Sequence, residues 1–324
     1  MGVPPQTGAP MRIFFLALFL AAVQSTAVAA QAHLLIVSGL GGEPKYVDDF
    51  HAWGTEMVDA AVERHGLARE NVIYLAENPD RDPQRIDGIS RREEVESALA
   101  RIAERAGPDD RVMILLIGHG SADARGSRIN LPGPDLTAEE LAGLLEPFSS
   151  QPLVIVNTAS ASGDFHEPLA AEHRTTITAT GSGMERNETL FGEFFVGAFA
   201  GDGADVDQDD RVTVTEAYEY AVRETERAYT TSNRLQLEHS RMEGDTELAG
   251  VFHLGAPGVA AIPEDASPEL RALYDERLRL QEEVESLRIR SGQMDPEEYQ
   301  QQLEQLLLEL ARTNRAIQDA GGDG

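Results

Sequence analysis

Two polar side chains follow apolar runs and have the types needed for acyl transfer. His119 follows the run 112–117, and Ser160 follows the run 153–156. An imidazole can act as a general base and a hydroxyl as a nucleophile, if the two groups come within hydrogen-bond reach. In parallel sheets ligands bind beyond the carboxyl ends of the strands, so we expect both residues at one such edge. Two simpler roles are a hydrogen-bonded histidine in a loop and a small residue in a tight turn.

Strands and helices alternate along the chain, which predicts an α/β fold. Near-continuous apolar runs predict buried strands over 33–38, 71–75, 112–117, 153–156 and 175–179. Helical spacing predicts helices over 48–65, 91–106, 137–145, 189–199 and 216–229. Thr137 and Glu140 have the spacing of a capping box at the start of one of them. The pattern predicts a mainly parallel sheet that is covered by helices on both faces.

The two strand-end motifs together resemble those of the legumain-like and caspase-like cysteine peptidases of the C13 type. In these families a strand ends in His-Gly, and the next strand leads to a nucleophilic Cys in a context such as Ala-Cys-x-Ser-Gly. Here residues 159–163 read Ala-Ser-Ala-Ser-Gly, so Ser160 stands at the position of the Cys, and the chain contains no cysteine. The resemblance extends over about 34–229 and implies a caspase-like three-layer α/β/α sandwich, which we assign to residues 31–256.

The resemblance also implies roles for single residues. His119 would be the general base and acid, Ser160 would take the place of the nucleophile, and the amides of Gly120 and Ser160 would hold the oxyanion. An alcohol needs a more closely placed base than a thiol does. The first interpretation is therefore a catalytically silent homologue that binds a peptide or protein partner. The alternatives are a hydrolase with His119 as base and Ser160 as nucleophile, and an unrelated function of the same sheet.

Residues 205–216 have the spacing of an EF-hand calcium loop. The ligand positions are taken by Asp205, Asp207, Asp209, Arg211 through its carbonyl, Thr213 and Glu216. Asp210 replaces the usual glycine, although Asp tolerates the left-handed conformation better than most residues. Predicted helices flank the loop, so a bound Ca²⁺ would tie them together. The alternative is a chance run of Asp in an acidic chain.

The composition changes near Gly255, after which Leu, Glu, Gln and Arg dominate. We expect a linker over 257–267 and an antiparallel, coiled-coil helical hairpin over 268–318. The apolar positions are Leu273, Leu280, Val284 and Leu287, and then Tyr299, Leu303, Leu306, Leu310 and Ile317. Gly292 can end the first helix, and Asp295 can cap the second. The hairpin either packs on the main domain or mediates self-association or partner binding.

Residues 1–30 have the order of a secretory signal peptide: Arg12, an apolar run over 13–23 and small residues over 27–30. The run is shorter than the roughly 20 residues that a membrane span needs. We expect a bacterial protein that is exported to the periplasm or secreted, with no transmembrane span once the signal is removed. The alternative is an uncleaved anchor.

The charge balance excludes one class of partner. The chain has 27 Lys and Arg residues against 56 Asp and Glu residues, a formal net charge of −29. Such a chain repels phosphate backbones, so we expect no nucleic-acid partner. Lys45 is the only lysine, which fits either a salt-adapted surface or a GC-rich genome. Without cysteine there are no disulfides, and stability must come from core packing.

Overall fold

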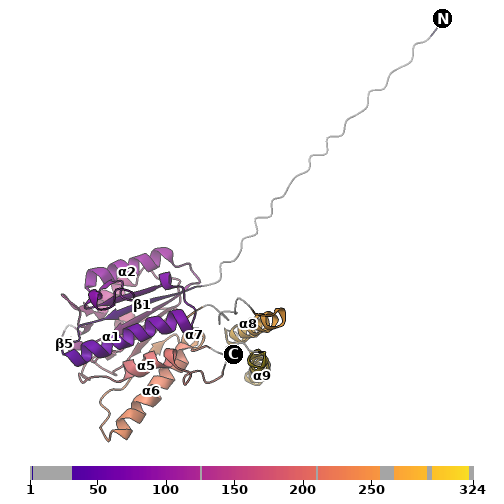
Figure 1. Cartoon of the computed structure of the whole chain (residues 1–324). Coiled ribbons are helices and arrows are strands. Elements are labelled where there is room, and N and C mark those ends of the chain that lie inside the picture. The colour runs from indigo at the N-terminus through magenta and orange to yellow at the C-terminus, as the bar shows by residue number, and fades with distance from the viewer. Residues whose placement is uncertain are drawn as a thin grey trace.

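The computed structural model describes residues 2, 31–124, 126–208, 211–255, 266–289 and 294–320. A seven-stranded sheet lies at its centre, in the order β10-β9-β8-β4-β1-β2-β3 (Figure 1). All neighbours pair in parallel except β10, which runs antiparallel to β9. The strands are β1 (Ala32–Ser38), β2 (Val72–Ala76), β3 (Gly88–Ile89), β4 (Arg111–Ile117), β8 (Leu153–Asn157), β9 (Arg174–Thr178) and β10 (Arg241–Gly244).

Helices cover both faces of this sheet, which confirms the predicted three-layer α/β architecture. In Figure 1, α1 and α5 lie on one side of β1 and α2 on the other. Alternate residues of β1 face opposite layers, so Leu34 packs in the core under α1 and α5, while Leu35 packs in the core under α2. The helices of the main domain are α1 (Pro44–Asp59), α2 (Arg92–Arg105), α3 (Ala138–Leu144), α4 (His166–Leu169), α5 (Phe191–Ala200), α6 (Val214–Thr231) and α7 (Thr246–Val251).

Local sequence signals account for the helix boundaries well. The predicted capping box begins α3: the Glu140 amide donates to Thr137 Oγ1 at 3.2 Å, and the Thr137 amide donates to Glu140 Oε2 at 3.0 Å. The first helix begins at Pro44, earlier than the predicted residue 48, because proline is favoured in the first turn. Its predicted end, over 60–64, is wound as a π-helix.

Several short strands were not predicted. They are β3 and β10 of the main sheet, together with a separate antiparallel sheet of β5 (Gly120–Asp123), β6 (Gly126–Ile129) and β7 (Leu136–Thr137). None of them has more than four residues, and β10 has the polar sequence Arg-Met-Glu-Gly. Such short segments show no alternation of apolar and polar residues that would predict a strand. Their pairing depends on neighbouring strands that are distant in the sequence.

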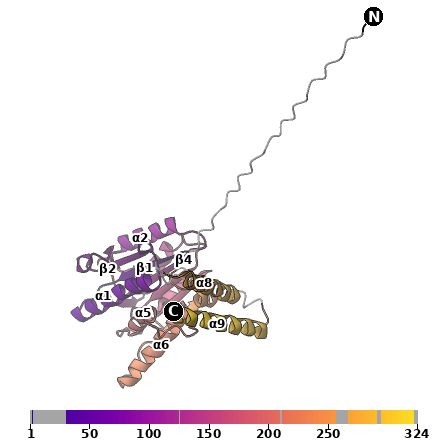
Figure 2. The same ribbon diagram turned by 45° about the vertical axis from the view of Figure 1, so that its right-hand side comes forward.

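The C-terminal segment forms the predicted pair of helices, α8 (Pro268–Ile289) and α9 (Pro296–Asp319), which lie side by side (Figures 1 and 2). Leu270, Tyr274 and Ile317 form a buried cluster between them. Asp295 caps α9 as predicted, because its Oδ1 accepts from the Glu298 amide at 3.3 Å. The hairpin also reaches the main domain, where Asn314 Nδ2 donates to the Gln208 carbonyl at 3.4 Å.

Some sequence predictions fall outside the described residues. They are the signal peptide over 1–30 apart from Gly2, most of the linker over 257–267, and the helix end at Gly292. Within the part of the chain that the structure describes, no helix is long and apolar enough to cross a membrane.

We predict that His65 makes stability depend on pH. Its ring donates a 2.8 Å hydrogen bond to the Phe199 carbonyl, and burial lowers its pKa to about 4. In the unfolded chain this histidine has a pKa of about 6.5. Between that pH and about pH 4, the unfolded state therefore binds a proton that the native state does not bind. The contribution is therefore fully present above about pH 6.5 and is lost as the pH falls toward 4.

The variant His65→Gln retains a donor for Phe199 and removes the titration. Between pH 7 and 5, its unfolding free energy in urea should fall by about 1–2 kcal/mol less than that of the parent. Parallel losses in the two proteins would show that His65 does not carry this dependence.

Candidate functional site

The parallel pairing of β4 with β8 brings the two predicted site residues to one edge of the sheet. In this pair Leu116 lies opposite Asn157. The chain therefore leaves β4 toward His119 and leaves β8 toward Ser160 at the same carboxyl edge. The expectation that the two residues share this edge is confirmed.

Ser160 makes its hydrogen bonds with the backbone of Gly120. Its hydroxyl donates to the Gly120 carbonyl at 3.1 Å and accepts from the Gly120 amide at 3.2 Å. Ser160 is only 5% exposed. A Cβ atom at Gly120 would lie 2.1 Å from the Ser160 carbonyl oxygen, so only glycine fits there. Among the described residues, no hydrogen bond joins His119 to Ser160.

His119 packs between two aromatic rings of α1. Its ring lies edge-on to Tyr46 and Phe50, with centroid distances of 4.5 and 5.1 Å. Burial lowers the pKa of His119, and a hydrogen bond with the Gly41 backbone opposes this shift only in part. The imidazole is therefore neutral at neutral pH and could accept a proton.

A cavity of about 300 Å³ opens beside His119. At its rim Glu188 Oε2 accepts from the Tyr46 hydroxyl at 2.7 Å and from Lys45 Nζ at 3.1 Å. These two hydrogen bonds lower the pKa of Glu188, which is therefore ionised at neutral pH. Ser160 does not line the cavity, whose walls are Lys45, Tyr46, Asp49, Phe50, Ala52, Trp53, Gly118, His119, Glu188, Thr189, Leu190 and Glu193.

Most of these cavity residues were missed in the sequence. Glu188 and Thr189 lie within 34–229, the range over which the sequence resembles the legumain-like enzymes. Asp49 and Glu193 gave no signal of their own, because isolated carboxylates are common in so acidic a chain.

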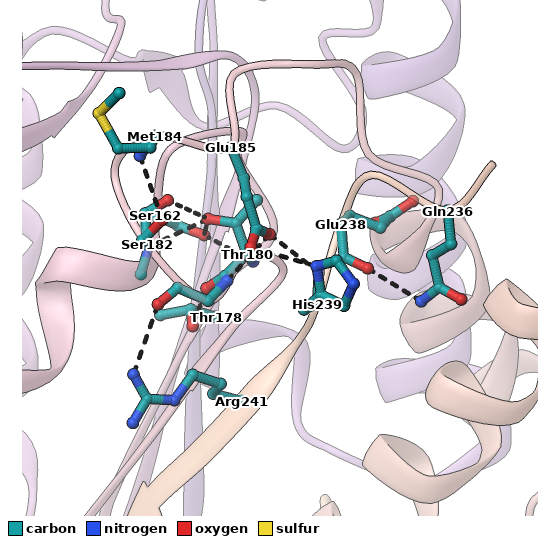
Figure 3. Close-up of polar contacts among 12 residues, drawn as sticks. Ser162, Thr178, Thr180, Ser182, Met184, Glu185, Gln236, Glu238, His239 and Arg241 are labelled. Carbon is teal, nitrogen blue, oxygen red and sulfur yellow. Dashed lines mark hydrogen bonds and ion pairs between the residues drawn. The ribbon is translucent and has the colours of Figure 1, made fainter.

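The loop after Ser160 is held by a polar network that Figure 3 shows. Ser162 Oγ and Thr180 Oγ1 lie 3.1 Å apart. The Thr180 oxygen also accepts from the Gly163 amide at 3.1 Å. Glu185 extends toward His239, and its Oε2 accepts from the His239 amide at 2.9 Å. Three segments far apart in the sequence thus fix the surroundings of the nucleophile position.

Glu238 holds the start of α5 from a distant loop. Its carboxylate accepts from the Leu190 amide at 2.8 Å and from the Phe191 amide at 3.1 Å. These are amides that a helix leaves unpaired at its N-terminus. Burial raises the pKa of Glu238, although the two amide hydrogen bonds lower it. The sequence carried no signal for this role, because Glu238 is remote from the helix.

The predicted calcium loop brings part of its ligand set together. Asp205, Asp207 and Glu216 have carboxylate oxygens within 4.8 Å of one another. Calcium, with ligand distances of about 2.3–2.6 Å, can contact atoms spaced in this way. Asp209 and Asp210 lie outside the described residues. The residues that are described fit a calcium ion.

Three of the predicted ligands of this loop, Arg211, Thr213 and Glu216, also have structural partners. Glu216 Oε2 accepts from the Thr213 amide at 2.9 Å, which completes a capping box at the start of α6. Arg211 is buried, with its guanidinium 3.4 Å from the ring of His253. Glu216 therefore serves the helix start and also faces the two Asp residues.

We predict that Ala161 stores backbone strain next to Ser160. It adopts φ = 54°, in the left-handed region, and its amide donates to the Glu185 carbonyl at 2.7 Å. A left-handed alanine costs roughly 1–2 kcal/mol, and glycine avoids this cost. Ala161→Gly should therefore destabilise the protein by about 1 kcal/mol less than Ala159→Gly does, because Ala159 is equally buried without a positive φ. Equal losses in urea denaturation would contradict the strain.

Comparison with known proteins agrees with this geometry. Residues 93–248 match the model of the Peptidase C13 family, a span that includes His119, Ser160 and the acidic loop. No curated protein matches the chain. The chain therefore carries a domain of the peptidase C13 family, and this domain has no cysteine to act as its nucleophile.

Proposed function

We propose that this protein is an exported, catalytically silent peptidase C13 homologue that acts as a calcium-stabilised binding or scaffold protein. The observation that carries the proposal is the pair of hydrogen bonds between the Ser160 hydroxyl and the Gly120 backbone. By analogy with the peptidase fold, the partner would be a peptide or another protein.

Both hydrogen bonds work against hydrolysis. The proton of Ser160 is directed at the Gly120 carbonyl, so it is not shared with His119, the residue assigned above as its base. The Gly120 amide, which would stabilise an oxyanion, already donates to the Ser160 oxygen. An attacking Ser160 would have to break both hydrogen bonds while remaining almost fully buried.

The alternative is a serine hydrolase, and one observation favours it. His119 lies at the same sheet edge, and burial lowers its pKa, so the neutral imidazole could act as a base. For this function Ser160 would rotate away from Gly120 and approach His119. The His119 ring is hydrogen-bonded to the Gly41 backbone, and no carboxylate among the described residues forms a hydrogen bond with it, which makes the alternative weaker.

We predict that a fluorophosphonate probe leaves Ser160 unlabelled, whereas an active serine hydrolase in the same tube reacts. The hydroxyl is buried and hydrogen-bonded to the backbone, and among the described residues no hydrogen bond joins it to His119. Intact-protein mass spectrometry measures the adduct. Labelling of Ser160 that disappears in His119→Ala would establish the hydrolase instead.

The calcium part of the proposal rests on the EF-hand spacing and on the approach of Asp205, Asp207 and Glu216. Asp209, the Arg211 carbonyl and Thr213 would complete the ligand set. An ion there would offset the repulsion among carboxylates and hold the loop against the start of α6. Because Gln208 accepts a hydrogen bond from Asn314, the same ion would also steady the contact with α9.

We predict that calcium raises the melting temperature and that Asp207→Asn reduces the rise. An ion that binds only the native state contributes about 2.7 kcal/mol at a hundredfold excess over its Kd. The matched control is Asp202→Asn, which removes the same charge from an exposed residue three positions before the loop. Thermal melts in calcium and in chelator should differ for the parent and the control. Identical melts at millimolar calcium would refute the site.

Export is supported by the signal-like order of residues 1–30, and N-terminal sequencing of the mature protein tests its removal. For the hairpin of α8 and α9 we propose self-association or partner binding in addition to its contact with the main domain.

A further inference from the structure

We propose that the cavity beside His119 binds a cationic side chain, the guanidinium of an arginine or the ammonium of a lysine, in a peptide partner. This inference rests on the proposed binding function and names its ligand class. The cavity lies between the N-terminal half of α1 and the segment that leads into α5.

The charges of the cavity wall are the first argument. Three carboxylates, those of Asp49, Glu188 and Glu193, face one ammonium, that of Lys45. Glu188 is already engaged by Lys45, Tyr46 and Arg234. Among the residues that the structure describes, none forms a hydrogen bond or an ion pair with the side chain of Asp49 or Glu193. The cavity thus has negative charge in excess, and a ligand that brings a positive charge would offset it.

The aromatic rings of the wall are the second argument. Tyr46, Phe50 and Trp53 lie along α1, with Phe50 and Trp53 centroids 5.6 Å apart. The faces of such rings attract cations, and most strongly where water is excluded. A neutral polar side chain would gain little from these rings, and an anionic one would be repelled by the carboxylates.

The protein itself already places a cation at this position. Lys45, the only lysine, has its Nζ 3.1 Å from Glu188 and 4.8 Å from the centroid of the Tyr46 ring. The Lys45 side chain is 63% exposed, so it is weakly held and can swing out. A ligand cation can use the same two kinds of contact elsewhere in the cavity, whose wall includes Asp49 and Trp53.

Size and the state of His119 agree with a single cationic side chain. A volume of about 300 Å³ is at the small end of ligand cavities and suits one side chain. Burial lowers the pKa of His119, so at neutral pH its ring adds no positive charge that would oppose the ligand.

Trp53 provides the readout, because it is the only tryptophan of the chain and it lines the cavity. The full-length protein is titrated with N-acetylarginine amide while the tryptophan emission is recorded. The control ligand is N-acetylcitrulline amide, which has nearly the same shape without the charge. We expect a saturable change with the arginine compound and at least tenfold weaker binding of the citrulline compound. No change, or equal binding of both ligands, overturns the inference.

Variants locate the binding and separate this inference from the proposed function. Glu193→Gln and Asp49→Asn should each weaken arginine binding about tenfold, as the loss of a charge-assisted contact does. Glu219→Gln, which removes a charge from an exposed position of α6 outside the cavity, should leave it unchanged. Equal effects of all three variants would mean that only net charge matters, and the inference fails. Ser160→Ala should bind the arginine compound as the parent does. Labelling of Ser160 by the fluorophosphonate probe would therefore contradict the proposed silent function but would not contradict arginine binding.

Discussion

The parallel pairing of β4 with β8 is the constraint on which the site depends. It places the chain that leaves β4 beside the chain that leaves β8, and the contact is so close that a side chain at Gly120 would meet the Ser160 carbonyl. A shift of the register by one residue would turn every side chain of the strand to the opposite layer, so the packed cores on both faces hold this pairing fixed. The pairing of β4 with β8 also determines where His119 and the cavity beside it lie.

The short distance between Ser160 and the Gly120 backbone determines which hydrogen bonds a serine makes at this position. A thiol is a weak donor and a weak acceptor, whereas a hydroxyl donates and accepts well. Beside the Gly120 peptide group, a hydroxyl is therefore drawn into the backbone hydrogen bonds that are observed. If Ser160 stands at the position of the cysteine of the family, the oxygen would be less reactive than sulfur. Its hydroxyl would also be bonded to the Gly120 backbone instead of to His119.

The sequence predicted those parts of the molecule whose signals are local. Buried strands have apolar runs, the start of α3 has Thr137 and Glu140, and the hairpin has its repeated leucines. The shared edge of His119 and Ser160 followed from the alternation of strands and helices. The partner of the Ser160 hydroxyl did not follow, because a rotamer depends on atoms within a few ångströms.

Features that join distant segments were not predictable in the same way. The short strand β10 pairs with β9 across more than sixty residues of intervening chain, and Glu238 caps a helix that begins far before it. The carboxylates of the cavity come from α1, from the segment that leads into α5 and from α5 itself, and nothing in α1 alone points to the other two. For the calcium loop the spacing was the signal, and the ion itself stays a prediction.

The central place of β1 has a consequence for how the chain is made. β1 precedes its partners in the sequence, yet it lies between β2 and β4 with all seven residues buried. During synthesis β1 cannot pair with β4 until residue 117, the last residue of β4, has been made. Sheets with such long-range pairing form slowly, and until they form, unpaired strand edges that can aggregate remain exposed. Until β4 has been made, the edge of β1 is therefore open to pairing with another chain.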